Sequence, residues 1–414
     1  MTERRRVVVT GLGVVSPLGL DEATLWQNML SGKCGIGMIR AFDTADYKTR
    51  IGAEVDNEQL CAAMQARGLV SADRTVDMAL AASGQALQQA GIIGGNPPYT
   101  PKDLATIFGS GVGASQTMYN SFITFTQKGV RGVRPTSVPR CMANAITAQI
   151  SMRFRLTGPN YVTVCACTSS TTAIGIAYRM IHDGYADKAL CGGSDTAFDP
   201  ATFAGWNNLG VMSKNPDPGK ACRPFDAGRD GCVLGEGAGA LVLESLESAR
   251  MRDANIRAEI CGYGESSDAE HITSPSPDGQ AKCIKAALAS AGMAPNDIGY
   301  INAHGTATKA NDECETKSIR LALGDTAARI PVGSNKSFFG HLLGASGAVE
   351  LIVTILGLEH KKVPPNLNLD NPDPACNLTL VGEYGMEVSS PVAMKNSFGF
   401  GGNNAVLIVR RWED

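Results

Sequence analysis

The feature that most constrains this chain is a regular alternation of short β-rich runs with longer alanine-rich segments of helical periodicity. The first units are RRVVVTGLG, TVDMALAASGQALQQAG and LATIFGSGVG, and later ones include DKALCGGSDTAF, GALVLESLESARMRDA and AEICGYGES. Such alternation is typical of α/β proteins with largely parallel sheets. The 414 residues are enough for two core-forming units or one large fused unit.

A looser repeat is present at the scale of half the chain. KCIKAALASAGMAPNDIGYINAHGT in the second half resembles DMALAASGQALQQAG followed by DLATIFGSG in the first half. In both places a helical pattern precedes a strand and a turn of glycine and hydroxyl residues. The halves meet around residues 250–262 with no flexible linker, so we expect two similar α/β units that share one core.

Composition and charge exclude several classes of protein. The net charge of -3 gives no reason to expect a nucleic-acid partner. The basic N-terminal tip leads directly into a strand pattern, so we expect no secretion signal. The most apolar segment, LLGASGAVELIVTILGLEH, is interrupted by Glu350 and predicts a buried helix instead of a membrane span.

The cysteines and histidines indicate a reducing compartment and no metal site. Twelve cysteines are scattered without CxxC pairs, which favours reduced thiols in a cytoplasmic protein. None of the five histidines stands at ligand spacing from a cysteine pair, so we expect no zinc site. The segment GLGVVS at residues 11–16 lacks the third glycine of a dinucleotide fingerprint and predicts a tight strand-to-helix turn.

The segment YVTVCACTSSTTAIG, residues 161–175, places two cysteines at a predicted strand-to-helix junction. Cys167 falls at the helix N-terminus, where the helix dipole and free backbone N–H groups lower a thiol pKa. Cys165 falls inside the predicted strand, where burial raises the pKa and leaves the thiol inert. Most cysteines are small core residues, so this segment alone does not decide whether either sulfur reacts.

Other segments place polar groups at strand ends, where α/β proteins bind ligands. In INAHGTATKANDECE, His304 ends an apolar strand, and in PVGSNKSFFGHLLGASGAVE, Lys336 lies in a polar turn before His341 opens a helix. NSFGFGGNNAVLIV, residues 396–409, is a glycine-dense turn before the last strand. Such a turn can present a backbone N–H to a developing oxyanion. Together these segments predict a site.

Four of these blocks, CACTSSTTAIG, NAHGTAT, KSFFGHLLGASGAVE and NSFGFGGNN, resemble the β-ketoacyl-[acyl carrier protein] synthases. The resemblance covers the whole chain, including RPFDAGRDGCVLGEGAGALVLE at residues 223–244. It implies a thiolase-like fold of two βαβαβαββ halves in five α-β-α-β-α layers. The nucleophile would lie in the half spanning residues 1–255 and both histidines in the half spanning residues 256–414.

The resemblance also implies a reaction: decarboxylative Claisen condensation of an acyl-cysteine thioester with malonyl-carrier protein. It needs no bound cofactor, since the substrates travel on the phosphopantetheine arm of the carrier protein. The family's site residues, carried over by motif, are the nucleophile Cys167, the catalytic His304, His341 and Lys336, and Phe400, whose N–H shares the oxyanion hole with that of Cys167. By the same resemblance we expect substrate contacts from Thr306, Thr308, Val112 and Trp206 and support for the lysine from Asp312 and Glu350.

Departures from the family pattern leave the acyl substrate open. GGNN at residues 401–404, KAND at residues 309–312, Trp206 and SFF at residues 337–339 favour a specialised fatty-acid-like or polyketide pathway over housekeeping elongation. The expected partners are an acyl carrier protein and a second ketosynthase-like chain, identical or different. Because carrier proteins are acidic, we expect a basic rim around the mouth of the pocket, with the candidates Arg67, Arg74, Lys128, Arg131 and Arg134.

Two other functions remain as alternatives. A non-catalytic, chain-length-type subunit of a ketosynthase heterodimer would share the fold, but such subunits lack the nucleophile, and this chain has Cys167. A thiolase acting on acyl-CoA needs a second cysteine as base, and His304 and His341 occupy the paired positions. Both alternatives are therefore weaker than a condensing enzyme.

Overall fold

The strands form one ladder that runs through both halves of the chain. In the computed structural model, which describes residues 4–95 and 97–413, 11 strands pair in a single sheet. Across the sheet their order is β12 (Thr379–Leu380), β10 (Pro331–Gly333), β9 (Tyr300–Asn302), β14 (Val392–Gly399), β15 (Asn403–Arg411), β8 (Ala258–Ser267), β1 (Val7–Val15), β7 (Gly237–Ser245), β6 (Lys188–Asp195), β4 (Ala105–Gly109) and β5 (Asn160–Thr163). Two small strand pairs are separate: β2 (Gly37–Met38) with β3 (Ile51–Gly52), and β11 (Lys362–Val363) with β13 (Met386–Glu387).

Helices connect these strands and cover them. They are α1 (Glu22–Leu30), α2 (Asn57–Ala66), α3 (Arg74–Gln89), α4 (Ser115–Lys128), α5 (Ser137–Cys141), α6 (Ala145–Phe154), α7 (Ser169–His182), α8 (Pro200–Leu209), α9 (Pro218–Ala221), α10 (Leu246–Met251), α11 (Pro277–Ala291), α12 (Lys309–Leu323), α13 (Lys336–Phe339) and α14 (Ser346–Glu359). Three short 3₁₀ turns matter for the site: η2 (Ala166–Thr168), η5 (Leu343–Ala345) and η7 (Phe400–Gly402).

The strand order repeats in the two halves. Counted outward from the centre, the first half is β1, β7, β6, β4 and β5, and the second is β8, β15, β14, β9 and β10. In each half two antiparallel pairings are followed by two parallel ones. The two similar halves are therefore confirmed, although each half is a mixed sheet and not a largely parallel one. We propose that the chain divides between them at residues 255/256.

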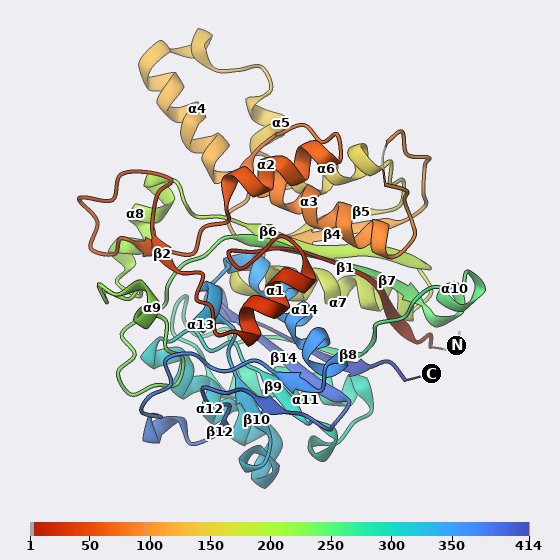
Figure 1. Cartoon of the computed structure of the whole chain (residues 1–414), viewed down its shortest axis with the longest axis vertical. Helices are drawn as coiled ribbons and strands as arrows, with labels where there is room; N and C mark the ends of the chain where they lie inside the picture. The colour runs from red at the N-terminus through yellow and green to blue at the C-terminus, as the bar shows by residue number, and fades with distance from the viewer. Residues whose placement is uncertain (1–3, 96, 414) are drawn as a thin grey trace.

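The elements stack in five layers, as the family resemblance implies. Figure 1 shows α3 and α6 above the strands of the first half, α7 and α14 below them, then the strands of the second half, then α11 and α12. The largest apolar cluster joins both halves through the middle layer, with Leu243 of β7, Ile352 of α14 and Leu407 of β15 all buried. A core shared by both halves is therefore confirmed, and the outer helices pack on further, separate clusters.

The two helices of the middle layer approach closely at their N-terminal ends. A Cβ at Gly347 of α14 would lie 2.0 Å from Oγ1 of Thr171 in α7. No larger residue fits there, because buried cores are close-packed and cannot give way by this much. The close approach matters for function, because the predicted nucleophile immediately precedes α7 and a predicted histidine precedes α14.

The expectation of a turn at residues 11–16 is wrong. Strand β1 continues through Val15, and its turn follows at Ser16 and Gly19. The glycines serve packing: a Cβ at Gly11 would lie 2.1 Å from the Ala86 carbonyl oxygen of α3, and one at Gly13 would lie 2.0 Å from that of Ala82. Glycine inside a strand often marks such a close approach of another backbone.

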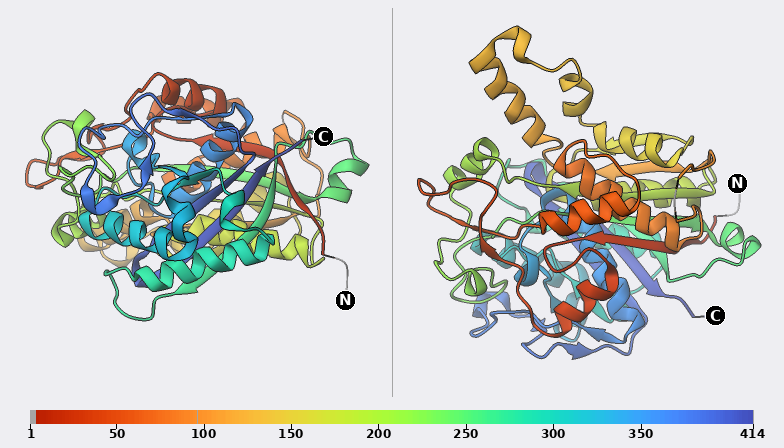
Figure 2. Two further views of the ribbon diagram at one scale, coloured as in Figure 1. Left: turned by 90° about the horizontal axis from the view of Figure 1, so that it is seen from below. Right: turned by 45° about the horizontal axis from the view of Figure 1, so that its top comes forward.

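One arm of the first half projects from the rest of the molecule. Helix α4 extends away from the layers in Figure 1 and in the right view of Figure 2, and neither α4 nor α5 has a buried residue. The large exposed apolar residues of this arm are Met118, Phe122, Ile123, Phe125, Val130, Val138 and Met142. Within the described part of the chain, none of the helices combines the length and the apolar character needed to cross a bilayer.

Candidate active site

The turn that carries Cys167 is closed by side-chain hydrogen bonds. Strand β5 ends at Thr163, and Cys165 lies in the turn, half-buried, not inside the strand as expected. The Ser169 hydroxyl accepts from the Cys165 N–H at 2.9 Å and donates to the Ala166 carbonyl at 2.7 Å. These bonds replace the strand ladder and direct Cys167 into η2, immediately before α7.

The expectation of a lowered pKa at Cys167 is wrong. The side chain is buried, and burial raises the pKa of the Cys167 thiol to about 11, although Lys336 and the backbone N–H of Phe400 act in the opposite direction. Burial removes hydration from the thiolate, and this loss exceeds the stabilisation that the helix N-terminus and Lys336 provide. The resting sulfur is therefore a thiol that needs a proton acceptor before it can attack.

The titratable group in direct contact with this thiol is His341. Its Nε2 lies 3.0 Å from the Cys167 sulfur, and its Nδ1 lies 2.9 Å from the Ser346 hydroxyl. His341 does not open a helix as predicted: it lies in the loop between α13 and η5, and α14 begins at Ser346. A hydroxyl both donates and accepts, so Ser346 is compatible with either tautomer of His341.

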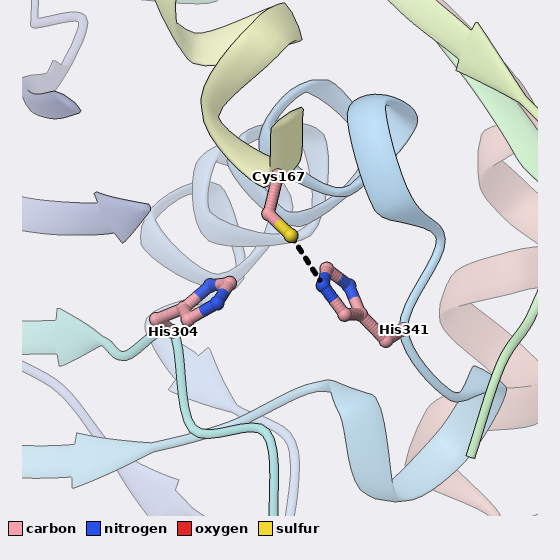
Figure 3. A group of neighbouring side chains, drawn as sticks. All are labelled: Cys167, His304 and His341. Carbon is pink, nitrogen blue, oxygen red and sulfur yellow. Dashed lines mark hydrogen bonds between the residues drawn. The ribbon is translucent and has the colours of Figure 1, made fainter. Parts of the chain in front are cut away.

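His304 completes the group. It follows the end of β9, as predicted, and its ring centroid lies 5.3 Å from that of His341 at an interplanar angle of 84°. Figure 3 shows both rings converging on the Cys167 sulfur from separate loops of the second half. Burial lowers the pKa of both His304 and His341 well below the usual range, and the ammonium of Lys336 adds to the effect. Both imidazoles are therefore neutral.

A backbone turn faces the sulfur from the other side. The N–H groups of Phe400 and Cys167 both point toward the Cys167 sulfur. Close approach requires glycine at position 399, where a Cβ would lie 3.1 Å from the Cys167 nitrogen. Gly401 has φ 78°, a left-handed conformation that glycine adopts without strain. Two backbone donors near one reacting atom have the arrangement of an oxyanion hole.

Lys336 lies beneath the histidines in a buried ionic network. Its Nζ donates to the His304 carbonyl oxygen and to Oε1 of Glu350, both at 2.6 Å. Asp312 lies outside this network: it accepts from the Phe225 N–H at 2.8 Å, and Arg229 is its cationic neighbour at 3.6 Å. Asp312 lies on the buried face of α12, but its carboxylate bonds the loop that carries Phe225 and not Lys336.

Two charged residues of this network were missed by the sequence reasoning. Glu315 accepts from the His304 and Gly305 N–H groups, both at 2.8 Å, and so fixes the strand end that carries His304. Lys395, buried in β14, lies 2.8 Å from Oε2 of Glu350. Both had a signal in the sequence: a charge at a position that the helix or strand pattern assigns to the core, which needs a buried partner.

Asp195 is a third missed residue. Its carboxylate at the end of β6 accepts from the N–H groups of Gly111, Val112 and Gly344 and from the Ser110 hydroxyl. It therefore joins the loop after β4 to the loop that carries His341. Burial raises the pKa of Asp195 to about 6, against the lowering effect of these donors.

The three reacting groups line a cavity of about 130 Å³. Thr306 and Thr308 also line it, with their hydroxyl oxygens 2.9 Å apart. Trp206 of α8 lines it and stacks on Phe400, with ring centroids 5.7 Å apart. Val112 was predicted to contact substrate but is exposed and not among the lining residues, because its loop is held toward Asp195.

The same three groups have the donor types of a metal site. The Cys167 sulfur and one nitrogen from each histidine lie within 4.8 Å of one another. The expectation of no zinc site rested on sequence spacing, and spacing does not reveal this grouping, since Cys167 and the histidines come from different halves. Thiolate and imidazole are ligands that zinc accepts.

The expectation of a basic rim at the mouth of the cavity that holds Cys167 is wrong, because none of the five predicted residues lines that cavity. Three of them lie instead at a second cavity, of about 860 Å³, between α2, α3 and the projecting arm. Arg74, Lys128 and Arg134 line it. Arg74 is not available to a partner, because its guanidinium bonds Glu236 at 2.7 Å. Lys128, Arg131 and Arg134 are exposed and form no ion pair with any residue that the structure describes.

Comparisons with known proteins agree with this geometry. Family models for the β-ketoacyl synthase N-terminal domain and C-terminal domain match residues 4–249 and 257–370. The chain is 40% identical over 412 residues to 3-oxoacyl-[acyl-carrier-protein] synthase 2 of Coxiella burnetii, covering 99% of each chain. It is also 40% identical over 414 residues to the protein of the same name from Synechocystis, again covering 99% of each.

Solved structures show the same fold over the whole length. The ishigamide ketosynthase/chain length factor superposes with a TM-score of 0.91 at 34% identity, covering 99% of this chain and 100% of the other. A type II polyketide ketosynthase solved with its acyl-carrier protein and bound to a hexaketide, AntDE:AntF, gives a TM-score of 0.91 at 29% identity and the same coverage. With both halves matched and the cysteine and two histidines brought together, the chain belongs to the β-ketoacyl synthase family.

Proposed function

We propose that this chain is a β-ketoacyl-[acyl-carrier-protein] synthase in which Cys167 is the nucleophile and His304 and His341 are the catalytic histidines. The observation that carries this proposal is the meeting of one buried thiol with two neutral imidazoles and two backbone donors at one cavity. Covalent catalysis divides a difficult carbon–carbon bond formation into an acyl transfer and a condensation.

In the first step Cys167 accepts the acyl group. His341 takes the thiol proton at Nε2 as sulfur attacks the carrier's thioester carbonyl, and the oxyanion that forms is held by the N–H groups of Cys167 and Phe400. The carbon–sulfur bond to the phosphopantetheine arm then breaks. The departing thiolate takes the proton back from His341, so the acyl-enzyme forms with the histidine neutral again.

In the second step malonyl-carrier protein occupies the cavity. Thr306 and Thr308 line the cavity where its carboxylate would lie. Its thioester oxygen accepts from the N–H of His304 and from Nε2–H of His341, which in the acyl-enzyme no longer faces a thiol proton and takes the tautomer with Nδ1 accepting from Ser346. When CO2 leaves, the electron pair of the broken carbon–carbon bond becomes an enolate whose oxygen these two donors stabilise. The enolate carbon attacks the acyl-Cys167 carbonyl, and the Cys167 sulfur leaves as a thiolate that takes up a proton from solvent water.

Mass spectrometry of the purified chain tests this proposal. Incubation with an acyl-carrier protein should add one acyl mass to the peptide that contains Cys167. Adding malonyl-carrier protein should remove that mass, release CO2 and yield β-ketoacyl-carrier protein. A chain that never carries the acyl mass and releases no CO2 would instead be the non-catalytic partner subunit. The length of acyl chain accepted separates fatty-acid from polyketide-type synthesis, and we propose the specialised pathway.

The proposed carrier-binding surface consists of Lys128, Arg131 and Arg134, beside the second cavity. Replacing Lys128 and Arg131 by glutamate should raise the KM for acyl-carrier protein about tenfold and leave kcat unchanged, because rim charges act mainly on encounter with an acidic partner. A matched control is Lys285→Glu on α11, in the opposite outer layer. An unchanged KM in the double variant, measured at low salt, would refute this surface.

We also propose that the chain pairs with a second ketosynthase-like chain, identical or different. Strand β5 is an edge of the sheet, and Tyr161 and Val164 beside it are exposed, as are the apolar residues of the projecting arm. Unpaired strand edges and large exposed apolar patches favour association. The mass of the assembly in solution separates a pair of identical chains from a mixed pair. Free thiols at all twelve cysteines are consistent with the proposed cytoplasmic location.

A further inference from the structure

The active-site network contains a second buried lysine that the mechanism above does not use. Lys395 lies in β14, just before the turn that carries Phe400, and its side chain is fully buried. Its ammonium lies 2.8 Å from Oε2 of Glu350, while Oε1 of the same carboxylate accepts from Lys336 at 2.6 Å. One buried carboxylate thus bridges two ammonium groups.

We propose that Lys395 is a positioning residue of this site: by sharing Glu350 with Lys336, it supplies the positive charge that keeps His304 and His341 uncharged at mildly acidic pH. The inference deepens the proposed function, since it concerns the same two histidines. It gives β14, the strand before the turn that carries Phe400, a second role in the reaction.

The contacts of Lys395 hold it in its charged form. Besides Glu350, its ammonium donates to the Asn396 carbonyl oxygen and to the Ser397 hydroxyl, the latter at 3.0 Å. Ser397 in turn lies 2.7 Å from the Thr171 hydroxyl in α7, the helix that follows Cys167. Burial lowers the pKa of Lys395, and Glu350 raises it. A buried ammonium with a carboxylate and two further oxygen acceptors is satisfied as an ion.

The charges that face the network come from several elements. Lys336 is on α13, Glu350 on α14, Glu315 on α12 and Lys395 on β14, and all four are buried. The two lysines and two glutamates balance when all are ionised, so removing Lys395 alone leaves one excess negative charge beneath the imidazoles. Both Lys336 and Lys395 lower the pKa of His304 and His341. Losing one ammonium therefore raises both histidine pKa values.

The consequence is a change in how the rate of the Cys167 reaction depends on pH, in the acid limb where the rate falls as the pH decreases. His341 accepts the Cys167 proton only while it is neutral, so the reaction slows as pH falls through the His341 pKa. In Lys395→Met this limb should move to higher pH by about one unit, as expected for a charge removed at short range in the interior. At any pH well below the wild-type limb, the rate in Lys395→Met should be about tenfold lower than the wild-type rate.

The experiment measures alkylation of Cys167 by iodoacetamide as a function of pH, followed on the Cys167 peptide by mass spectrometry. It needs no carrier protein or acyl substrate, so it reports on the thiol–imidazole pair even if condensation is not the chain's function. Malonyl decarboxylation over the same pH range is the second readout. Wild-type and variant chains are compared with thermal melts recorded at each pH to confirm folding.

The double variant Lys395→Met with Glu350→Gln separates charge from packing. It removes one positive and one negative charge together, so the acid limb should return to within about 0.3 pH units of the wild-type position even if the overall rate is lower. A limb that stays at the wild-type pH in Lys395→Met overturns the proposal. A limb displaced as far in the double variant as in the single one also overturns it. If the single variant does not fold, a double variant whose limb lies away from the wild-type position overturns it.

Discussion

Replacing Cys167 by alanine should abolish condensation while malonyl-carrier protein still releases CO2. Without the sulfur there is no acceptor for the acyl group, so no acyl-enzyme forms and β-ketoacyl product should fall below detection, a loss of at least about 10⁴-fold. The two imidazoles proposed to stabilise the enolate follow β9 and precede η5, and each is also held by groups other than the thiol.

Three quantities are measured side by side for this variant: the acyl mass on the peptide that spans position 167, the β-ketoacyl product by chromatography, and the CO2 released. Cys165→Ala is the matched control, two residues away in the same turn and half-buried, and it should keep both acylation and product formation. If the Cys167→Ala chain still carries an acyl group, another residue is the nucleophile. If CO2 release falls as far as condensation does, the histidines do not act independently of the sulfur.

Replacing His304 by alanine should lower malonyl decarboxylation by about 10² to 10³ and leave acylation of Cys167 nearly unchanged. Removal of one preorganised donor to a developing oxyanion has this size of effect. Acylation is spared because the Cys167 sulfur is paired with His341 at 3.0 Å, whereas His304 contacts the network through its backbone carbonyl and N–H groups. Those backbone contacts remain in the alanine variant.

Single-turnover kinetics separate the two steps. The rate of acyl transfer is measured with acyl-carrier protein alone, and the rate of CO2 release with malonyl-carrier protein alone. His182→Ala is the control, a histidine at the C-terminal end of α7 that pairs with Asp183. Equal losses in both steps of the His304 variant would contradict the division of roles, as would a loss confined to acylation.

The corrections share one physical origin. The turn predicted at Gly11 and Gly13 is a strand, because those glycines make room for the backbone of α3, a contact that local sequence does not contain. The thiolate predicted from the position of Cys167 before a helix is a thiol, because desolvation by neighbouring layers exceeds the effect of the helix end. Asp312 has the spacing of a supporting residue, yet it bonds the Phe225 N–H.

The sequence by itself determined which chemical groups form the candidate site and the order in which they occur along the chain. Cys167, His304, His341 and Lys336 all follow predicted strands, and the ends of strands follow from local patterns of apolar and turn residues. The polar turn predicted at Lys336 is the short helix α13. The repeat of two α/β halves is likewise visible as a pattern. Local periodicity is sufficient for these features, since each depends on residues close together in the chain.

Only the tertiary structure decided how these groups act on one another. The contact between the Cys167 sulfur and His341 joins residues 174 positions apart, and the bridge from Glu350 to Lys336 and Lys395 joins α14 to α13 and β14. Burial, which sets the protonation state of the thiol and both imidazoles, depends on how five layers pack around them. Desolvation and charge pairing depend on distances in space, and separation along a chain does not determine those distances.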